Sequence, residues 1–218
     1  MNETMKGTED LMKTTIRIVA GSLRGRKLTC DVNPELRPTP QMVREAFFSI
    51  LGNAIPGRVF VDLFAGTGVV GLEALSRGAS QALFVERDFR HAQDLERHIR
   101  AFGVTRQAKL FRTDVYRWIA AWRPPSEAVN VFLSPPFADL DERTDNLREA
   151  LAALQDKVAE DSVIVLQSER GSAMEDAPEM AGWEYRRYSR NVLMIWQKAA
   201  AQVSDVSKVE IEHDGDGD

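Results

Sequence analysis

The sequence is poor in the residues that build disulfides and metal centres. It has one cysteine, Cys30, and three histidines among 218 residues. A single cysteine excludes an internal disulfide and a multi-cysteine metal site, and the histidines lack ligand spacing, so we expect no structural metal. No run approaches the roughly 18 apolar residues of a membrane span. The first residues, MNETMKGTEDLMKTT, lack the apolar core of a secretory signal, which predicts a cytoplasmic protein with no membrane partner.

The length accommodates one domain of ordinary size. Hydrophobic residues make up 44% of the chain and charged residues 28%, a balance typical of a soluble globular protein. We expect a monomer with one folded unit over residues 15–198, between a disordered N-terminus at 1–14 and a disordered acidic tail at 199–218. Within that unit, residues 15–40 are predicted to form a basic hairpin extension of the main domain.

Charge is unevenly distributed along the chain. Residues 199–218 contain six acidic residues and one lysine, which accounts for the whole net charge of −5. Residues 13–44 contain seven basic and two acidic residues, so this segment is suited to contact a polyanion. The candidate contacts to such a polyanion on the predicted hairpin are Arg17, Arg24, Arg26 and Lys27. The alternative is an ordinary solvated surface.

From Arg58 onward, apolar runs alternate with amphipathic segments. The apolar runs are short and continuous, as in strands that helices cover on both faces, so they predict a mostly parallel sheet in an α/β fold. Five such strands are expected in RVFVDLF, QALFVER, QAKLFRT, AVNVFLS and DSVIVLQS. Two further runs, GWEYRRYS and NVLMIWQK, follow without an intervening helix. They predict an antiparallel C-terminal hairpin at the edge of a seven-stranded sheet.

A glycine motif follows the first of these strands. In VFVDLFAGTGVVGLEAL, Gly66, Gly68 and Gly71 form G-x-G-x-x-G between an apolar strand and a predicted helix. Glycines here let the backbone approach a ligand, and the helix start presents free N–H groups. Glu86 stands 20 residues after Gly66, at the end of the next strand, where a carboxylate accepts hydrogen bonds from ribose hydroxyls. The motif indicates a nucleoside-bearing cofactor; the alternative is a turn used only for packing.

Two aspartates bear on the identity of that cofactor. Asp62 stands four residues before Gly66, where a carboxylate would repel the pyrophosphate of a dinucleotide but attract the ammonium and sulfonium of S-adenosylmethionine. The methyl donor is therefore favoured, although Asp62 also suits a helix cap or a loop brace. Asp114 follows the third strand, where it suits the adenine amine and equally the N-cap of the next helix.

The fourth strand ends in the tetrapeptide Ser134, Pro135, Pro136 and Phe137. Its two prolines fix the backbone at the carboxyl edge of the sheet, where open α/β folds bind ligands. Unbonded carbonyls there are suited to hold an amine, and the ring of Phe137 is suited to stack on a planar base. For the tetrapeptide alone, the alternative is a Pro-Pro turn with a core phenylalanine.

Six segments carry a family resemblance. In chain order they are RIVAGSLRGRKL, LRPTPQMVREAFFSIL, VDLFAGTGVVGLEALSRGA, FVERD, SPPF and NVLMIWQK. Together they closely resemble the bacterial 16S ribosomal RNA guanine-N2 methyltransferases of the RsmD type, over about residues 16–198. The resemblance implies a Rossmann-like class I methyltransferase fold, S-adenosyl-L-methionine as the cofactor, and a guanine of 16S rRNA or the small ribosomal subunit as the acceptor.

The resemblance also implies roles for individual residues. Those implied for the cofactor loop are Asp62, Phe64, Gly66, Thr67 and Gly68. Those implied for the ribose and the adenine are Glu86, Arg87 and Asp114. The tetrapeptide Ser134, Pro135, Pro136 and Phe137 would hold the target base, with its amine at the Ser134 hydroxyl and the Pro135 carbonyl. Arg37 and Arg44 match a stretch near the cleft and are expected to contact RNA.

The tetrapeptide departs from the family at its first position. The family usually has aspartate there, and this chain has Ser134. A hydroxyl is a weaker acceptor than a carboxylate, which predicts slower transfer or help from another carboxylate. Three alternatives stay open: a methyltransferase acting on a DNA base or a protein amide, a nucleotide-dependent oxidoreductase, and a catalytically weakened RNA-binding homologue. Small size favours RNA over DNA, and Asp62 opposes the oxidoreductase.

Overall fold

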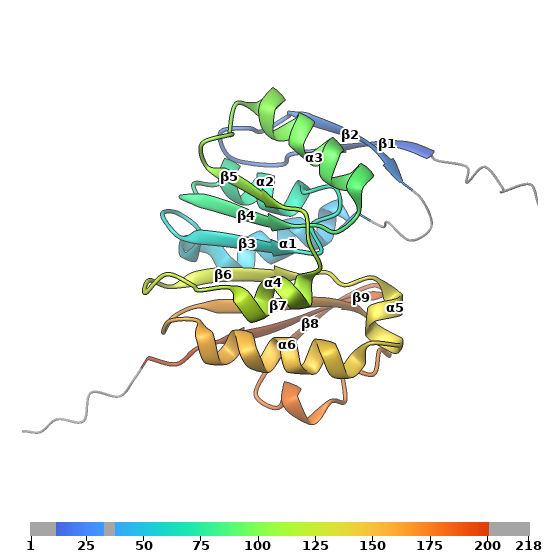
Figure 1. Ribbon diagram of the computed structural model, residues 1–218, viewed down its shortest axis with the longest axis vertical. Coiled ribbons are helices and arrows are strands. Elements are labelled where there is room, and N and C mark those ends of the chain that lie inside the picture. Colours follow the sequence, from blue (N-terminus) through green and yellow to red (C-terminus); the bar gives the residue numbers. More distant parts are fainter. Residues whose placement is uncertain (1–11, 33–37, 201–218) are drawn as a thin grey trace, which may run out of the picture.

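The computed structural model describes residues 12–32 and 38–200, and its centre is one sheet (Figure 1). The strands of this sheet are β3 (Val59–Leu63), β4 (Gln81–Val85), β5 (Ala108–Phe111), β6 (Val129–Leu133), β7 (Val163–Glu169), β8 (Glu184–Tyr188) and β9 (Asn191–Gln197). Their order is β5-β4-β3-β6-β7-β9-β8. The first five are parallel, while β9 runs antiparallel to both β7 and β8. The predicted α/β sheet with an antiparallel C-terminal hairpin is confirmed.

Helices cover both faces of the sheet. They are α1 (Gln41–Leu51), α2 (Val69–Ser76), α3 (Phe89–Phe102), α4 (Val115–Ala121), α5 (Phe137–Asp141) and α6 (Thr144–Lys157). One core cluster joins α1, α2 and α3 to the sheet through buried residues such as Phe47, Leu72 and Leu95. A second cluster joins α4 and α6 to the other face, and Trp118 and Leu151 are among its buried residues. Burial of this apolar surface holds the layers together.

The basic hairpin is a small sheet of its own. Its strands β1 (Met12–Arg17) and β2 (Lys27–Val32) pair antiparallel, and β1 begins three residues before the expected start at residue 15. The turn between them docks on the end of α2, because the Ser22 N–H donates to the Ser76 carbonyl at 2.7 Å. A Cβ atom on Gly21 would lie 1.8 Å from that carbonyl oxygen, so only glycine fits there.

A five-residue helix, α5, begins at the last residue of the tetrapeptide. Residues 1–11 and 201–218, which make up most of the two ends expected to be disordered, lie outside the described residues. Among the described helices, none combines the length and the apolar character that crossing a membrane requires.

Candidate active site

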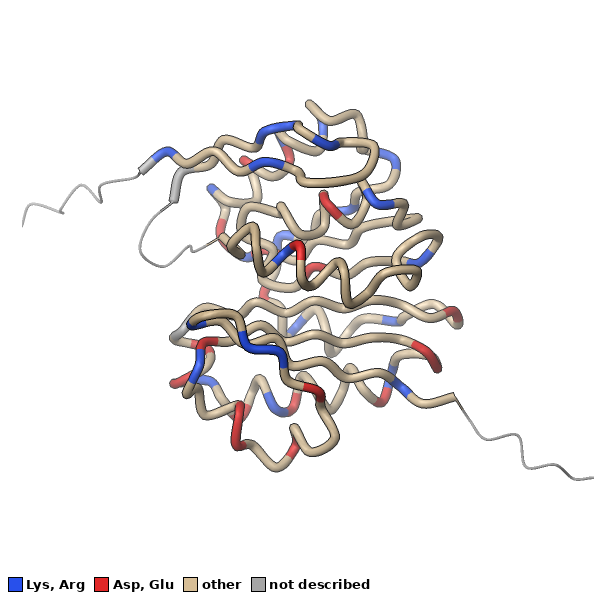
Figure 2. Tube along the Cα trace, turned by 180° about the vertical axis from the view of Figure 1, so that it is seen from behind, with Lys and Arg blue, Asp and Glu red and all other residues tan. Residues whose placement is uncertain are grey.

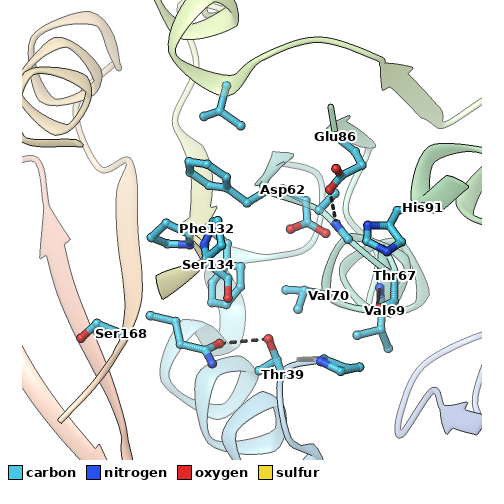
Figure 3. A pocket seen from close by; sticks show the side chains of 18 of the residues that line it. Thr39, Asp62, Thr67, Val69, Val70, Glu86, His91, Phe132, Ser134 and Ser168 are labelled. Atoms are coloured by element: carbon cyan, nitrogen blue, oxygen red, sulfur yellow. Dashed lines mark hydrogen bonds between the residues drawn. The ribbon is translucent and has the colours of Figure 1, made fainter. Parts of the chain in front are cut away.

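A cavity of about 570 Å³ opens at the carboxyl ends of the parallel strands. It lies where the chain reverses its winding, between β4 and β3 on one side and β6 and β7 on the other, which is the usual ligand site of an open α/β sheet. In Figure 3, Glu86 and His91 lie at one end, Ser134 and Ser168 at the other, and Asp62 between them. The predicted residues that line it are Asp62, Phe64, Gly66, Thr67, Glu86, Arg87, Asp114, Ser134, Pro135 and Pro136.

The glycine motif forms the floor of this cavity and leads into α2. Gly66 and Gly68 have φ angles of +50° and +70°, a region that favours glycine. Gly68 is absent from the cavity wall, and a Cβ atom on it would lie 2.2 Å from Leu95 Cδ1. Gly68 is therefore required for the turn and for packing on α3. Phe64 has a φ of +58°, a strained angle for a bulky residue, and such strain often occurs at functional sites.

Asp62 combines a structural bond with a place on the cavity wall. Side chains alternate along β3, so Asp62 points to the same face of the sheet as α2, and its Oδ2 accepts a hydrogen bond from the Gly71 N–H at 2.9 Å. The loop brace that the sequence left open is thus present. Only 2% of Asp62 is exposed, and burial raises the pKa of its carboxyl to about 8, a rise that the Gly71 bond opposes.

Glu86 joins the ends of two neighbouring strands. Its Oε2 accepts the Gly66 N–H at 2.7 Å and its Oε1 accepts the Asp88 N–H at 2.7 Å. The glycine loop after β3 is therefore fixed to the end of β4. A carboxylate has about four acceptor sites, so these two bonds leave Glu86 capacity for hydroxyl donors of a ligand.

Asp114 is the N-cap of α4, which is one of the two roles that the sequence predicts for it. Its Oδ1 accepts the N–H groups of Tyr116 at 3.0 Å and Arg117 at 3.2 Å. The same residue lines the cavity, so capping does not remove it from the site. Arg87 also lines the cavity and is exposed at its rim.

The tetrapeptide forms the wall facing the glycine loop. The Ser134 N–H donates to the Leu63 carbonyl at 3.3 Å, which extends the contact between β3 and β6 beyond the strand ends. The Pro136 carbonyl accepts hydrogen bonds that begin α5, whereas within the described part of the chain no backbone bond engages the Pro135 carbonyl. Phe137 begins α5, but its side chain, expected to stack on a base, lies outside the described residues.

The structure corrects the expectation for Arg44. This residue was expected to contact RNA, but it is 2% exposed and lies 3.4 Å from the buried Glu73 of α2. Its guanidinium also donates to the carbonyls of Thr39 and Arg17. A guanidinium committed to these partners cannot reach a phosphate, so Arg44 fastens α1 to α2 and to the hairpin. Arg37, the other residue of that stretch, lies outside the described residues.

The basic residues of the hairpin lie on its surface. Figure 2 shows lysines and arginines along both strands, and Arg17, Arg24, Arg26 and Lys27 are exposed. Arg26 has a second role, because its Nη2 donates to the Ala101 carbonyl at 2.5 Å and its guanidinium lies 4.7 Å from the centre of the Phe102 ring. It therefore attaches the hairpin to α3.

Sequence reasoning missed one polar wall of the cavity. The Thr39 hydroxyl donates to Gln167 Oε1 at 2.9 Å, and Gln167 Nε2 donates to Asn191 Oδ1 at 3.1 Å. These residues come from the segment just before α1, the end of β7 and the start of β9. One signal could have found Gln167: it is a polar residue at the carboxyl end of an apolar strand, as Asp62 and Glu86 are.

The strand order defines the class of protein. A parallel sheet with its switch point between two βαβ halves, and with β9 inserted antiparallel beside an edge strand, is the arrangement of Rossmann-like class I methyltransferases. The cavity lies at the switch point, and the protein is a methyltransferase of this class.

Comparison with known proteins identifies the family. A family model described as Conserved hypothetical protein 95 matches residues 16–197, and the chain belongs to that family. Ribosomal RNA small subunit methyltransferase D of Escherichia coli K12 is 33% identical over 191 residues, which are 87% of each chain. The solved structure of Escherichia coli yhhF, named as a methyltransferase, has 31% identity and a TM-score of 0.68, over 86% of this chain and 99% of that chain.

A more distant structure shares the fold alone. It is the T. thermophilus 16S rRNA N2 G1207 methyltransferase, solved with AdoMet and guanosine. It is 18% identical to this chain, with a TM-score of 0.65 over 86% of this chain and 50% of that chain.

Proposed function

We propose that the protein transfers a methyl group from S-adenosylmethionine to the exocyclic N2 amine of a guanine in 16S ribosomal RNA. One observation carries this proposal: the acidic and glycine-rich wall made by Asp62, Gly66 and Glu86 shares one cavity with the tetrapeptide wall at Ser134 and Pro135. A reaction between two bound molecules needs both reacting atoms in one pocket, held in line and at near-attack distance.

The chemistry of the first wall fits the methyl donor. Asp62 is a buried carboxyl whose pKa is raised by burial, so a cationic ammonium beside it would compensate its charge and favour its ionised form. Glu86 has acceptor capacity for the ribose hydroxyls, and Asp114 for the adenine amine. When bound, S-adenosylmethionine supplies an electrophilic methyl group on a positively charged sulfur.

The second wall is suited to an exocyclic amine. The amine of guanine is a poor nucleophile because its lone pair is delocalised into the ring, so acceptors on its hydrogens must orient it. The Pro135 carbonyl and the Ser134 hydroxyl are the acceptors we assign to it. The target base must leave its stack to enter this pocket, and Phe137, the last residue of the tetrapeptide, is assigned to stack on it.

RNA is the polymer that the relatives indicate. The Escherichia coli relative is named for the RNA of the small ribosomal subunit. Exposed Arg17, Arg24 and Lys27 offer the phosphate contacts that position a protein on RNA without reading its sequence.

The direct test is methyl transfer with a labelled donor. The protein is incubated with labelled S-adenosylmethionine and either unmodified 16S rRNA or small subunits, and the labelled nucleotide is then mapped. The expected product is N2-methylguanine at one position, with transfer strongly reduced in Asp62→Ala. Label on a protein amide of the small subunit would favour the protein alternative that Ser134 leaves open, and absence of binding of S-adenosylmethionine would contradict the proposal altogether.

A further inference from the structure

A polar cluster behind the cavity wall joins the two halves of the site. It consists of Asp114 and Tyr116 at the start of α4, Asp139 in α5 and Arg143 before α6. The Tyr116 hydroxyl donates to Asp139 Oδ2 at 2.8 Å, and Arg143 Nη1 lies 3.6 Å from the same oxygen. Arg143 Nη1 also lies 3.5 Å from Asp114 Oδ2. One guanidinium nitrogen therefore bridges a carboxylate of the cavity wall and a carboxylate of α5.

The burial of Asp139 makes these contacts necessary. Asp139 is 1% exposed, and a buried carboxylate without partners is strongly destabilising. Burial and the Asp139 carboxylate raise the pKa of the Tyr116 hydroxyl, so it keeps its proton and stays a donor. The Arg143 guanidinium also lies 4.3 Å from the centre of the Tyr116 ring, and this cation–π contact helps to hold Arg143 in the cluster. Asp139 thus depends on Tyr116 and Arg143 for its place in the fold.

The place of Asp139 in turn determines the place of the tetrapeptide. Helix α5 has five residues, which is too few for a helix to be stable without tertiary contacts. It begins directly after Pro136, whose carbonyl accepts the Asp139 N–H at 3.0 Å. The bond from Tyr116 to Asp139 ties α5 to α4, and the buried Leu140 belongs to the core cluster that α4 and α6 share. Any shift of α5 would move the Pro135 carbonyl within the cavity.

We propose that Arg143 is a positioning residue that couples the donor half of the site to the acceptor half. This inference rests on the proposed function, in which Asp114 meets the donor and Ser134 and Pro135 hold the acceptor amine. When the methyl donor hydrogen-bonds to Asp114, it restrains that carboxylate. The guanidinium of Arg143, which contacts both carboxylates, passes the restraint to Asp139 and α5. Donor and acceptor then bind cooperatively, and by linkage each raises the affinity of the other by the same factor.

Calorimetry measures this coupling with S-adenosylhomocysteine, which is what remains of the methyl donor after transfer and which cannot react further. The dissociation constant of S-adenosylhomocysteine is determined with and without saturating unmodified 16S rRNA, for the wild-type chain, Arg143→Met and Arg148→Met. Arg148 is a matched control: it lies in α6, its side chain is 32% exposed against 33% for Arg143, and its carboxylate neighbours are Asp145 and Glu179, away from the cavity. We expect RNA to tighten S-adenosylhomocysteine binding by about tenfold in the wild type and in Arg148→Met.

In Arg143→Met we expect that factor to fall to about one, while the affinity for S-adenosylhomocysteine alone changes by less than about threefold. An unchanged coupling factor in a folded Arg143→Met would overturn the positioning role and leave the proposed function intact. A wild type that binds S-adenosylhomocysteine without any coupling to RNA would overturn it equally. A wild type that does not bind S-adenosylhomocysteine at all would instead refute the proposed function, and the inference with it.

Single-turnover kinetics separates positioning from a general structural defect. We expect Arg143→Met to lower the transfer rate at saturating methyl donor and RNA by about tenfold, because the acceptor amine is misplaced. At saturating RNA we also expect the methyl-donor concentration that gives half of this rate to rise by about tenfold, because RNA no longer tightens donor binding. Arg143→Lys, which keeps the charge, is expected to recover part of the rate. If Arg143→Met does not fold, Tyr116→Phe removes the hydrogen bond from the Tyr116 hydroxyl to Asp139 and tests the same prediction. Equal rates in folded Tyr116→Phe and wild type would then overturn it.

Discussion

At the scale of single residues, the buried Asp62 links the stability of the protein to pH. Burial raises the pKa of its carboxyl from 3.8 to about 8, so between these values the folded chain keeps a proton that the unfolded chain has lost. The free energy of unfolding therefore falls as pH rises from about 4 to about 8, by at most about 1.4 kcal/mol per pH unit from this group.

Asp62→Asn tests this linkage, because the asparagine oxygen can still accept the Gly71 N–H but the side chain cannot ionise. We expect the stability of the variant relative to the wild type to increase steadily from pH 5 to pH 8. Urea unfolding at fixed ionic strength measures the difference. A difference that does not change with pH would show that Asp62 titrates normally in the folded chain.

Ser134 is the second residue whose chemistry can be tested alone. A neutral hydrogen bond contributes about 1 kcal/mol and a charged acceptor about 1 kcal/mol more. We expect Ser134→Ala to slow single-turnover transfer about fivefold, and Ser134→Asp to accelerate it about fivefold. Donor affinity serves as the control and should stay constant in both. Unchanged transfer in Ser134→Ala would exclude the hydroxyl as a holder of the amine.

At the scale of elements, α2 is packed too closely on the sheet to accept a larger residue at Gly71. Alanine has a higher helix propensity than glycine by about 1 kcal/mol, but a Cβ atom here would lie 2.3 Å from Cε1 of the buried Phe84. Overpacking costs about 1–3 kcal/mol, so we expect Gly71→Ala to destabilise the fold by about 1 kcal/mol net. Thermal or urea unfolding measures it.

A double-mutant cycle identifies the cause of that loss. If the contact with Phe84 is responsible, Gly71→Ala should cost less in a Phe84→Leu background than in the wild type. The same cost in both backgrounds would point instead to the Gly71 N–H and its bond to Asp62.

At the scale of the whole molecule, the basic hairpin is expected to govern the salt dependence of RNA binding. Each phosphate contact contributes about one to the slope of log affinity against log salt, and slightly less for single strands. We expect Arg24→Ala and Lys27→Ala each to lower that slope by about one. Arg186 is the control, since it is exposed in β8, at the edge of the sheet far from β5 and from the α3 helix that holds the hairpin. A slope that is the same in all three variants and the wild type would place the RNA elsewhere.

Several features could be predicted from the sequence because they depend on neighbouring residues. The apolar strands, the glycine turn into α2 and the capping aspartates are local patterns with one favoured structure each. A polar residue at the end of a parallel strand also has a predictable place, because the carboxyl ends of the strands share one edge. That rule put Asp62, Glu86 and Ser134 into one cavity.

Other features were decided only by the tertiary structure. Arg44 has the sequence context of a surface residue, and only the meeting of α1 with α2 puts it beside Glu73. The bridge from Asp114 through Arg143 to Asp139 joins three helices, and the bond between Thr39 and Gln167 spans 128 positions. Local patterns fix where strands and helices form, because their hydrogen bonds and periodic faces lie within a few residues. Which polar side chains pair depends on how those elements pack, because burial leaves a charge only the partners that the fold brings within reach.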